Sequence, residues 1–169
     1  MNIIMKIKCY LIPISFFVLT SCNLREINYS DEELNSIKLD IMKNKEIISY
    51  SDYTEYMSNN SDFDSILRSD LLPYSLKMKE VDPIAYFDFF QEFLRINNNG
   101  KYNARDILKL SEPEQNLLIY YLEEGAKKEQ EYCVAVLAKF YEEGIYYEKN
   151  VKKSDSLTSI IYPSKVSRP

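Results

Sequence analysis

The stretch from Ser111 to Lys153 constrains the fold of this chain most, because it carries two helical patterns separated by a short polar segment. Ser111 and Glu114 have the spacing of a capping box, and Pro113 falls in the first turn, where its missing N–H leaves no hydrogen bond unmade. Apolar residues then recur every three to four positions, at Leu117, Leu118, Tyr121, Leu122 and Ala126 and again at Cys133, Val136, Leu137, Phe140 and Tyr141. Helices this short are stable only when their apolar faces are packed. The stretch therefore predicts two helices that pack against each other.

The second helix and the residues after it match the pattern of a known repeat at Cys133, Leu137, Ala138, Tyr141, Gly144, Asn150 and Lys153. These residues resemble the Sel1-type repeat, a relative of the tetratricopeptide repeat. Its pattern is small-x-x-x-Leu-small-x-x-Tyr-x-x-Gly, followed by an Asp or Asn and then a Lys. Gly125 and Ala126 match the small pair of the preceding helix. The resemblance implies an all-α fold, a short αα-repeat forming a right-handed solenoid after an N-terminal signal helix, and work as a scaffold or adaptor.

Three positions depart from the pattern of that family. Cys133 and Gly125 each replace an alanine, and Glu129 stands where the turn between the two helices usually has a glycine. Because of Glu129, one continuous helix over residues 113–143 is an alternative to the helix pair. Gly144 keeps the pattern and is expected to end the second helix in the left-handed conformation.

The first 21 residues have the form of a secretory signal rather than a part of the fold. Lys6 and Lys8 form a basic start, and the mostly apolar segment 9–19 is too short to span a bilayer. The sequence Leu-Thr-Ser-Cys that ends at Cys22 resembles the lipobox of bacterial lipoproteins. This resemblance implies that Cys22 is acylated and becomes the new N-terminus. The alternative is a cleaved soluble signal that a cysteine follows by chance.

These observations divide the chain into the signal peptide 1–21, a tether 22–29, one Sel1-like domain 30–163 and a frayed tail 164–169. Membrane attachment would come from acyl chains, since each buried CH₂ contributes about 0.8 kcal/mol and two or more chains suffice for stable anchoring. Residues 23–26 lack the acidic run that resembles a surface-export tag in some Bacteroidota lipoproteins. The expected location is therefore the cell envelope, at the outer membrane and facing the periplasm.

The charge of the chain limits its partners. The net charge is −5, from 21 basic and 26 acidic residues. Loss of Lys6 and Lys8 with the signal leaves 19 basic against 26 acidic residues, a net charge of −7. Such a surface argues against nucleic acid and against binding to anionic lipid by charge. The expected partners are a protein or peptide, and a membrane only through the lipid.

Capping signals and apolar spacing predict further helices on either side of the central pair. Ser30 and Glu33 form another capping box, ahead of a helix with Leu34, Ile37 and Ile41 on one face. We expect other helices over 47–57, with a tyrosine stripe, over 63–80, and from Asp82-Pro83 onward. In the last of these, Ala85, Phe89 and Phe93 indicate an earlier, degenerate repeat. A helical turn is expected over 104–110. A final helix, capped by Asn150 and ended by Pro163, is expected to run through Lys153, Leu157, Ile160 and Ile161.

The composition argues against an enzyme. The chain has no histidine, which excludes Ser-His and Cys-His nucleophile pairs and the common zinc sites, and it has no glycine-rich phosphate loop. A two-carboxylate hydrolase is chemically possible, but each pair of acidic residues falls on a polar helix face or near a helix end. Cys133 lies within an apolar stripe and is expected to be a buried small hydrophobe. We therefore expect no catalytic residues, no metal and no cofactor.

The remaining function is binding. The candidate contact residues are the tyrosines Tyr121, Tyr132, Tyr146 and Tyr147, because aromatic residues carry much of the energy of interfaces. For Tyr121 and Tyr141, packing between helices is an equally good explanation. The leading hypothesis is a lipid-anchored helical-repeat protein that holds a protein or peptide. The alternatives are an immunity protein of the envelope that neutralises a basic toxin, and a passive spacer in a larger assembly.

Overall fold

A computed structural model of the chain describes residues 29–59 and 69–162. These residues form seven α-helices and one 3-10 helix, which are α1 (Asp31–Asn44), α2 (Ile47–Asn59), α4 (Leu71–Met78), α5 (Ile84–Asn97), η1 (Ala104–Lys109), α6 (Glu112–Lys127), α7 (Glu131–Glu143) and α8 (Val151–Ile161). No strand occurs in these two ranges. The prediction of an all-α fold is confirmed for the described part of the chain.

Several predictions concern residues outside the described ranges. They are the signal segment 1–21, acylation at Cys22, nearly all of the tether 22–29, and the tail 164–169. The helix expected over 63–80 lies only partly within them, and its described part is α4 together with the residues beside it. These predictions stay predictions.

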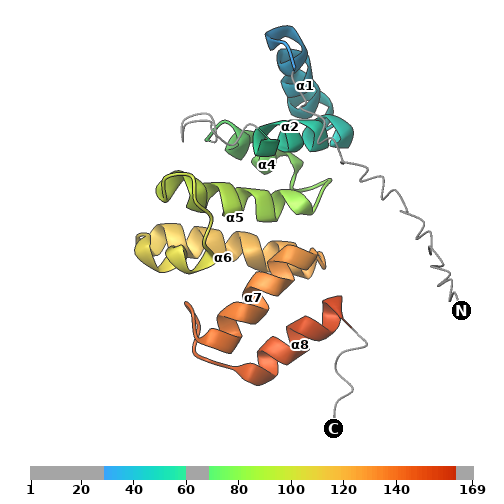
Figure 1. The fold of residues 1–169 in the computed structure, drawn as a ribbon. Coiled ribbons are helices and arrows are strands. Elements are labelled where there is room, and N and C mark those ends of the chain that lie inside the picture. The colour runs from blue at the N-terminus through green and yellow to red at the C-terminus, as the bar shows by residue number, and fades with distance from the viewer. Residues whose placement is uncertain (1–28, 60–68, 163–169) are drawn as a thin grey trace, which may run out of the picture.

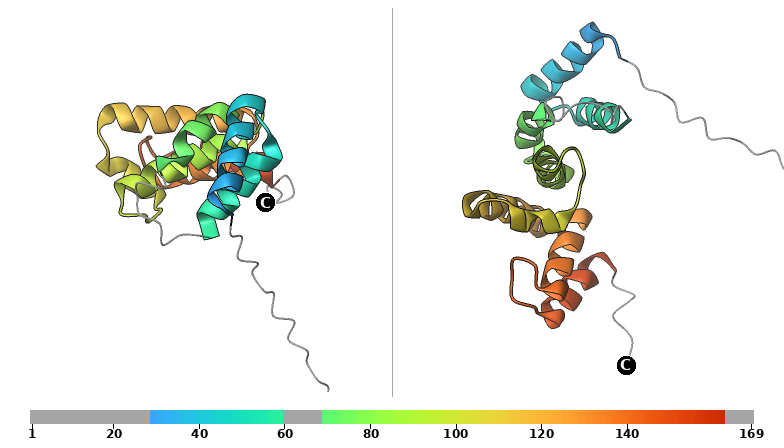
Figure 2. Two further views of the ribbon diagram at one scale, coloured as in Figure 1. Left: turned by 90° about the horizontal axis from the view of Figure 1, so that it is seen from above. Right: turned by 60° about the vertical axis from the view of Figure 1, so that its left-hand side comes forward.

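The helices follow one another along a stack, with α1 at one end and α8 at the other (Figure 1). Each helix packs mainly on its neighbours in the sequence, while α1 also contacts α4 and α5 also contacts α7. Figure 2 shows the same succession from the side and from above. Because contacts are local along the chain, each helix depends most directly on the one before it and the one after it.

The central pair is a helical hairpin, so the alternative of one continuous helix over 113–143 is wrong. Glu129 turns the chain with a φ angle of 58°, in the left-handed region. That conformation costs a residue with a side chain roughly 1–2 kcal/mol. The backbone N–H of Gln130 donates to the carbonyl of Gly125 at 3.0 Å and closes the turn. Hydrogen bonding and packing thus form the reversal without a glycine.

The predicted helix caps are confirmed. Glu33 accepts a hydrogen bond from the Ser30 backbone N–H at 2.8 Å, and Glu114 accepts one from that of Ser111 at 2.9 Å. Gly144 ends α7 with a φ angle of 74°, and its N–H bonds to the carbonyl of Phe140 at 3.0 Å. The side chain of Asn150 caps α8 by accepting from the Lys153 N–H at 3.0 Å. Short polar side chains thus set the helix ends in both halves of the molecule.

Two hydrophobic cores lie along the stack. The N-terminal core joins α1, α2 and α4 to the start of α5 and consists of Ile41, Tyr50, Tyr53, Met57, Leu71, Met78 and Ala85. The C-terminal core joins α5, η1, α6 and α7 and consists of Tyr86, Phe89, Phe90, Leu94, Ile107, Leu118, Ile119, Tyr121, Leu122, Cys133, Leu137, Phe140 and Ile145. Helix α5 contributes residues to both cores. Helix α5 therefore belongs to both halves of the molecule.

The C-terminal core is tightly fitted where α6 meets α5 and α7. A Cβ atom placed on Gly125 would lie 2.5 Å from the Sγ atom of Cys133 and 2.9 Å from the Cβ atom of Tyr86, closer than folded proteins allow. Cys133 is fully buried, as predicted. Gly125 of α6 and Cys133 of α7 thus face each other. The smaller residue makes room for the larger one.

The last helix predicted from Asn150 is present as α8, and its residues are buried to different degrees. Leu157 and Ile161 are half-buried, but Ile160 is 46% exposed, and Ser154 is buried in its place. Ser154, Leu157 and Ile161 follow the i, i+3, i+7 spacing of one helix face, which is the face that packs on α7. The packed face of α8 therefore includes a hydroxyl one turn from the cap.

Candidate functional site

A groove of about 350 Å³ lies between α6, α7 and α8. It is lined by Glu123, Ala126, Lys127, Leu137, Tyr141, Lys153 and Leu157, and we name it the α6–α8 groove. Its floor is apolar, since Leu137 and Tyr141 are buried and Ala126 and Leu157 are half-buried. Its edges carry charge, since Glu123, Lys127 and Lys153 are exposed. An apolar floor between charged edges is typical of sites that hold a segment of another molecule.

The Tyr141 ring of the groove floor stacks on that of Tyr147, which does not line the groove itself. The rings of Tyr141 and Tyr147 lie 4.3 Å apart between centroids and are inclined by 17°. The Tyr147 hydroxyl donates to Oε1 of Glu123 at 2.7 Å, which ties the loop after α7 to α6. Burial, followed by the Glu123 carboxylate, raises the pKa of Tyr147, so this hydroxyl stays protonated and continues to donate. Tyr147 is therefore held by two contacts, with the Tyr141 ring and with Glu123.

The amino group of Lys153 is also held at the α6–α8 groove. Its Nζ atom lies 4.2 Å from the centroid of the Tyr141 ring and donates to the Tyr141 hydroxyl at 2.6 Å. A cation above an aromatic face is attracted by the ring, by about 0.5–1 kcal/mol at an exposed site. The ammonium group thus stays beside the apolar floor although most of the side chain is in solvent. Lys153 contributes a fixed positive charge to the edge of the groove.

The predicted contact tyrosines occupy three different places. Tyr146 is 37% exposed and donates to Oδ1 of Asn116 at 2.6 Å, and its ring meets that of Tyr147 edge-on beside the groove. Tyr132 is 54% exposed but stacks on Phe87, away from the residues that line the groove. Tyr121 is only 4% exposed.

Tyr121 packs between helices rather than facing solvent. Its ring stacks on that of Phe89 of α5 with 4.2 Å between centroids, and the Nζ atom of Lys79 lies 5.0 Å from the ring centroid on the other side. This is the position that the packing alternative describes. None of the four tyrosines is among the described residues that line the α6–α8 groove, and Tyr147 is the one that contacts two of those residues, Tyr141 and Glu123.

Within the described residues, neither a metal-binding cluster nor an exposed thiol occurs at the groove. Within residues 29–59 and 69–162, no group of three or more Cys, Asp or Glu side chains could hold a metal ion. Cys133 is buried in the C-terminal core and not at the surface, and burial raises the pKa of its thiol to about 12. A thiol that is buried and protonated is a poor nucleophile. What the arrangement offers a ligand is apolar contact, one carboxylate and two ammonium groups.

The comparisons with known proteins identify no family. No protein-family model matches the sequence, no curated protein matches it, and no solved structure matches the fold. Among the described helices, none has both the length and the apolar character needed to cross a membrane. The findings define an all-helical domain of about eight helices that pack mostly on their sequence neighbours.

Sequence reasoning did not place Glu123, Lys127 and Leu157 in one site. A signal for part of it exists, since Glu123, Ala126 and Lys127 share one face of α6 by their i, i+3 and i+4 spacing. That face carries charge and reads from sequence as a solvated surface. Only the position of α8 across from it turns the face into one side of a groove.

Proposed function

We propose that this chain is a binding module of the cell envelope that holds a segment of a protein or peptide in the α6–α8 groove. The observation that carries the proposal is the groove itself, which places an apolar floor between fixed charges of both signs. An extended segment with alternating apolar and charged side chains would satisfy both features. Aromatic and aliphatic side chains at the centre supply most of the affinity, and the charges at the edge supply orientation.

The proposed relationship to Sel1-type repeats is supported by the roles of the matching residues. Leu137, Ala138 and Tyr141 are buried along α7. Gly144 has the positive φ angle and Asn150 the capping role that a compact connection to a following helix needs. Each conserved-type position of the pattern thus has a physical task in this fold. Gly125 and Cys133 together keep α6 and α7 closely packed. The two alanines that the pattern has at these positions would do the same.

The groove is tested with two variants that introduce the same residue on different faces of α8. The parent is the soluble form that carries Cys22→Ser, used to capture proteins from an envelope extract. Leu157→Lys places a charge on the groove floor, whereas Ile160→Lys places the same charge on an exposed position of the same helix. We expect Leu157→Lys to weaken capture about tenfold, the effect of roughly 1.4 kcal/mol, and Ile160→Lys to leave it unchanged.

Two results contradict this proposal. One is that the parent captures no protein reproducibly. The other is that Leu157→Lys and Ile160→Lys reduce capture equally, which would locate the contact elsewhere or indicate non-specific adhesion. Thermal unfolding of both variants, followed by circular dichroism, checks that a loss of capture is not a loss of folding.

We place the module on a membrane through acylation of Cys22, the first residue after the signal segment 1–21. Mass analysis of the mature chain is the direct test. We expect an N-terminus at Cys22 that carries acyl groups, and a Cys22→Ser chain that leaves the membrane fraction. An unmodified Cys22 in the mature protein would remove the tether and leave the groove unaffected.

A further inference from the structure

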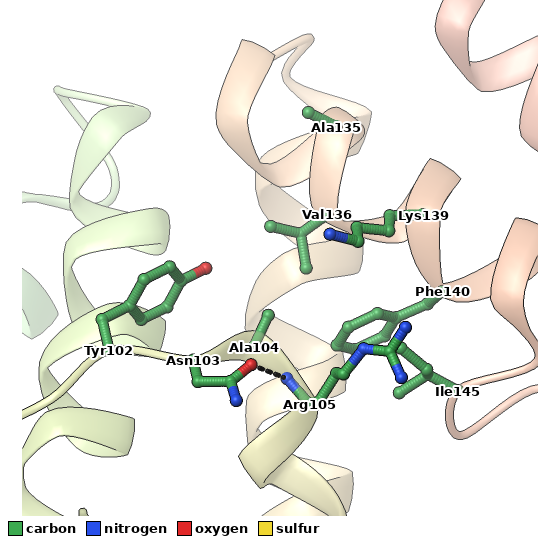
Figure 3. Close-up of a pocket in the computed structure, with 9 residues that line it drawn as sticks. All are labelled: Tyr102, Asn103, Ala104, Arg105, Ala135, Val136, Lys139, Phe140 and Ile145. Atoms are coloured by element: carbon green, nitrogen blue, oxygen red, sulfur yellow. Dashed lines mark hydrogen bonds between the residues drawn. The ribbon is translucent and has the colours of Figure 1, made fainter.

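A second hollow lies on another side of α7 and shares no residue with the α6–α8 groove. Its volume is about 370 Å³, and it opens between α7 and the segment that leads into η1. Figure 3 shows Tyr102 on one side of it and Val136 and Lys139 on the other, with Arg105, Phe140 and Ile145 at its lower end. We name it the η1–α7 hollow.

The apolar part of the η1–α7 hollow is held firmly by the C-terminal core. Phe140 is fully buried and Ile145 is 5% exposed, so both present one face to the hollow and are packed on every other side. Val136 is half-buried on the adjoining turn of α7. Tyr102 is fixed by edge-on contacts with Phe87 and Phe90, with centroids 6.1 and 6.4 Å apart. The surface offered to a ligand is therefore preformed.

Two hydrogen-bond donors at the hollow have no acceptor among the residues that the structure describes. Neither the hydroxyl of Tyr102 nor the amino group of Lys139 makes a hydrogen bond or an ion pair within the described residues, although both line the same hollow. Burial raises the pKa of the Tyr102 hydroxyl to about 12, so that it stays a donor at neutral pH. A half-buried hydroxyl that faces a hollow without a partner is unusual, because polar groups near the interior normally find one.

The charge around the hollow is opposite to that of the whole protein. The chain has a net charge of −5, yet no carboxylate lines this hollow. Its charged lining residues are Arg105 and Lys139. Arg105 pairs with Glu143 at 2.8 Å and presents the rest of its planar guanidinium to the lower end. An anionic group is attracted to such a site and repelled from most of the remaining surface.

We propose that the η1–α7 hollow binds a free carboxylate that is joined to an apolar group about as large as one or two aliphatic side chains. The carboxylate accepts hydrogen bonds from the Tyr102 hydroxyl and the Lys139 ammonium, and the apolar group lies on Val136, Phe140 and Ile145. Inorganic anions are poor ligands here because they leave the apolar surface uncovered. The carboxyl end of a polypeptide with an apolar last residue has this chemistry, and so does a small amphiphilic acid.

The chemistry is tested with matched pairs of probes that differ only in the carboxylate. We use N-acetyl-leucine with its amide, and an acetylated tripeptide ending in leucine with its amide, each titrated into the chain that carries Cys22→Ser and followed by NMR. Both acids are expected to bind and both amides to bind about tenfold more weakly, because charge-assisted hydrogen bonds are roughly twice as strong as neutral ones. If neither acid binds better than its amide, the proposal is overturned.

Four variants, one of them a control, locate the binding. Lys139→Gln and Tyr102→Phe each remove one donor, and each is expected to weaken the acids about fivefold or more without affecting the amides. Lys152→Gln removes an exposed lysine of α8 and is the control for net charge. Ala135→Glu puts a carboxylate on an exposed position at the hollow and is expected to abolish binding of the acids. Acid binding that all four variants leave unchanged, or that Lys152→Gln weakens as much as Lys139→Gln, overturns the proposal.

The two probe sizes distinguish the sources of the ligand. About tenfold tighter binding of the tripeptide acid than of N-acetyl-leucine identifies the end of a polypeptide, since the extra residues then make contacts of their own. Equal or tighter binding of N-acetyl-leucine identifies a small acid. Both results support the proposed chemistry. Because the hollow shares no lining residue with the α6–α8 groove, failure of either site leaves the other standing.

Discussion

In the N-terminal core, two of the largest fully buried side chains are tyrosines that reach carboxylates, whereas in the C-terminal core the closest fit is between a glycine and a cysteine. The Tyr50 hydroxyl donates to Asp88 at 2.8 Å and that of Tyr53 donates to Asp70 at 2.9 Å. At Gly125, by contrast, no polar group is involved, and the contact depends on the absence of a methyl group. One half of the molecule is specified by paired polar groups and the other by shape.

The two halves of the molecule therefore respond to different perturbations. A hydrogen bond from a buried hydroxyl to a carboxylate depends on the protonation state of the acid and is sensitive to pH. A close apolar contact is insensitive to pH and sensitive to volume. Since α5 carries Asp88 as well as Phe89 and Phe90, each of the two perturbations can be applied on this one helix.

The largest effect is expected from Phe90→Ala, which empties a fully buried position of the C-terminal core. Large-to-small changes of this kind cost about 3–5 kcal/mol, and the loss should be equal at about pH 5 and about pH 8 because no charge is involved. Urea unfolding at both values measures it. A loss that differs strongly between the two would mean that the cores are not chemically distinct.

The next largest effect concerns Asp88 of α5. Burial, partly opposed by the hydrogen bond from Tyr50, raises the pKa of this carboxyl from 3.8 to about 7. The folded state thus holds a proton that the unfolded state has released, so stability falls as pH rises from about 4 to about 7 and then levels off. Between about pH 5 and about pH 8 the wild type should lose about 2–3 kcal/mol by this route.

Asp88→Asn keeps the shape and removes the titration, so its unfolding free energy should lack this part of the pH dependence. Urea unfolding of the variant beside the wild type isolates the contribution of Asp88 from those of other carboxylates. If the two proteins lose stability in parallel over this range, the carboxyl is not protonated in the folded state.

A smaller effect is expected at the glycine–cysteine contact. Gly125→Ala gains about 1 kcal/mol of helix propensity but inserts a Cβ between Cys133 and Tyr86, an overpacking that costs about 1–3 kcal/mol. We expect a net loss of about 1 kcal/mol. Adding Cys133→Ala to that variant should recover part of the loss, because it removes the 2.5 Å approach and leaves the 2.9 Å approach to Tyr86. A double-mutant cycle of melting curves measures the coupling, and additive effects would refute the compensation.

The smallest effect compares two positive φ angles, one in each half. Glu129→Gly relieves the strained turn between α6 and α7, where φ is 58°, and should stabilise by about 0.5–1 kcal/mol after the extra entropy of glycine in the unfolded chain is counted. Lys45→Gly makes the same change after α1, where φ is 52°, but also removes the 2.7 Å ion pair with Glu80. It should therefore gain less. Melting temperatures rank the two variants, and the opposite order would contradict this account.

Helix ends could be predicted from the sequence because their causes lie within three or four residues. Ser30, Ser111 and Asn150 each satisfy backbone groups of their own helix, and Gly144 supplies its own backbone freedom. The turn at Glu129 was harder to predict, since its hydrogen bonds and packing outweigh a local preference against it. Local chemistry thus sufficed for the starts of α1, α6 and α8 and for the end of α7, whereas α4 and α5 have no side-chain hydrogen bond at the N-cap.

The sites could not be predicted in the same way, because their residues meet only through tertiary packing. Leu157 reaches the α6–α8 groove because α8 folds back on α7. Tyr102 reaches the η1–α7 hollow from the connection just before the helical turn that was expected over 104–110. Tyr121 is of a residue type that is common at interfaces, but it is buried in the core. Spacing along one helix predicts which residues share a face. It does not predict which other element packs against that face.

The burial of Cys133 gives this protein a built-in reporter of its own motions. Once Cys22 is acylated or replaced, Cys133 is the last thiol in the chain after residue 21. It lies where α6 and α7 meet, so an alkylating reagent can reach it only when those two helices separate. The rate of labelling therefore reports how often the hairpin opens, without any engineered probe. A ligand that contacts both helices should lower this rate.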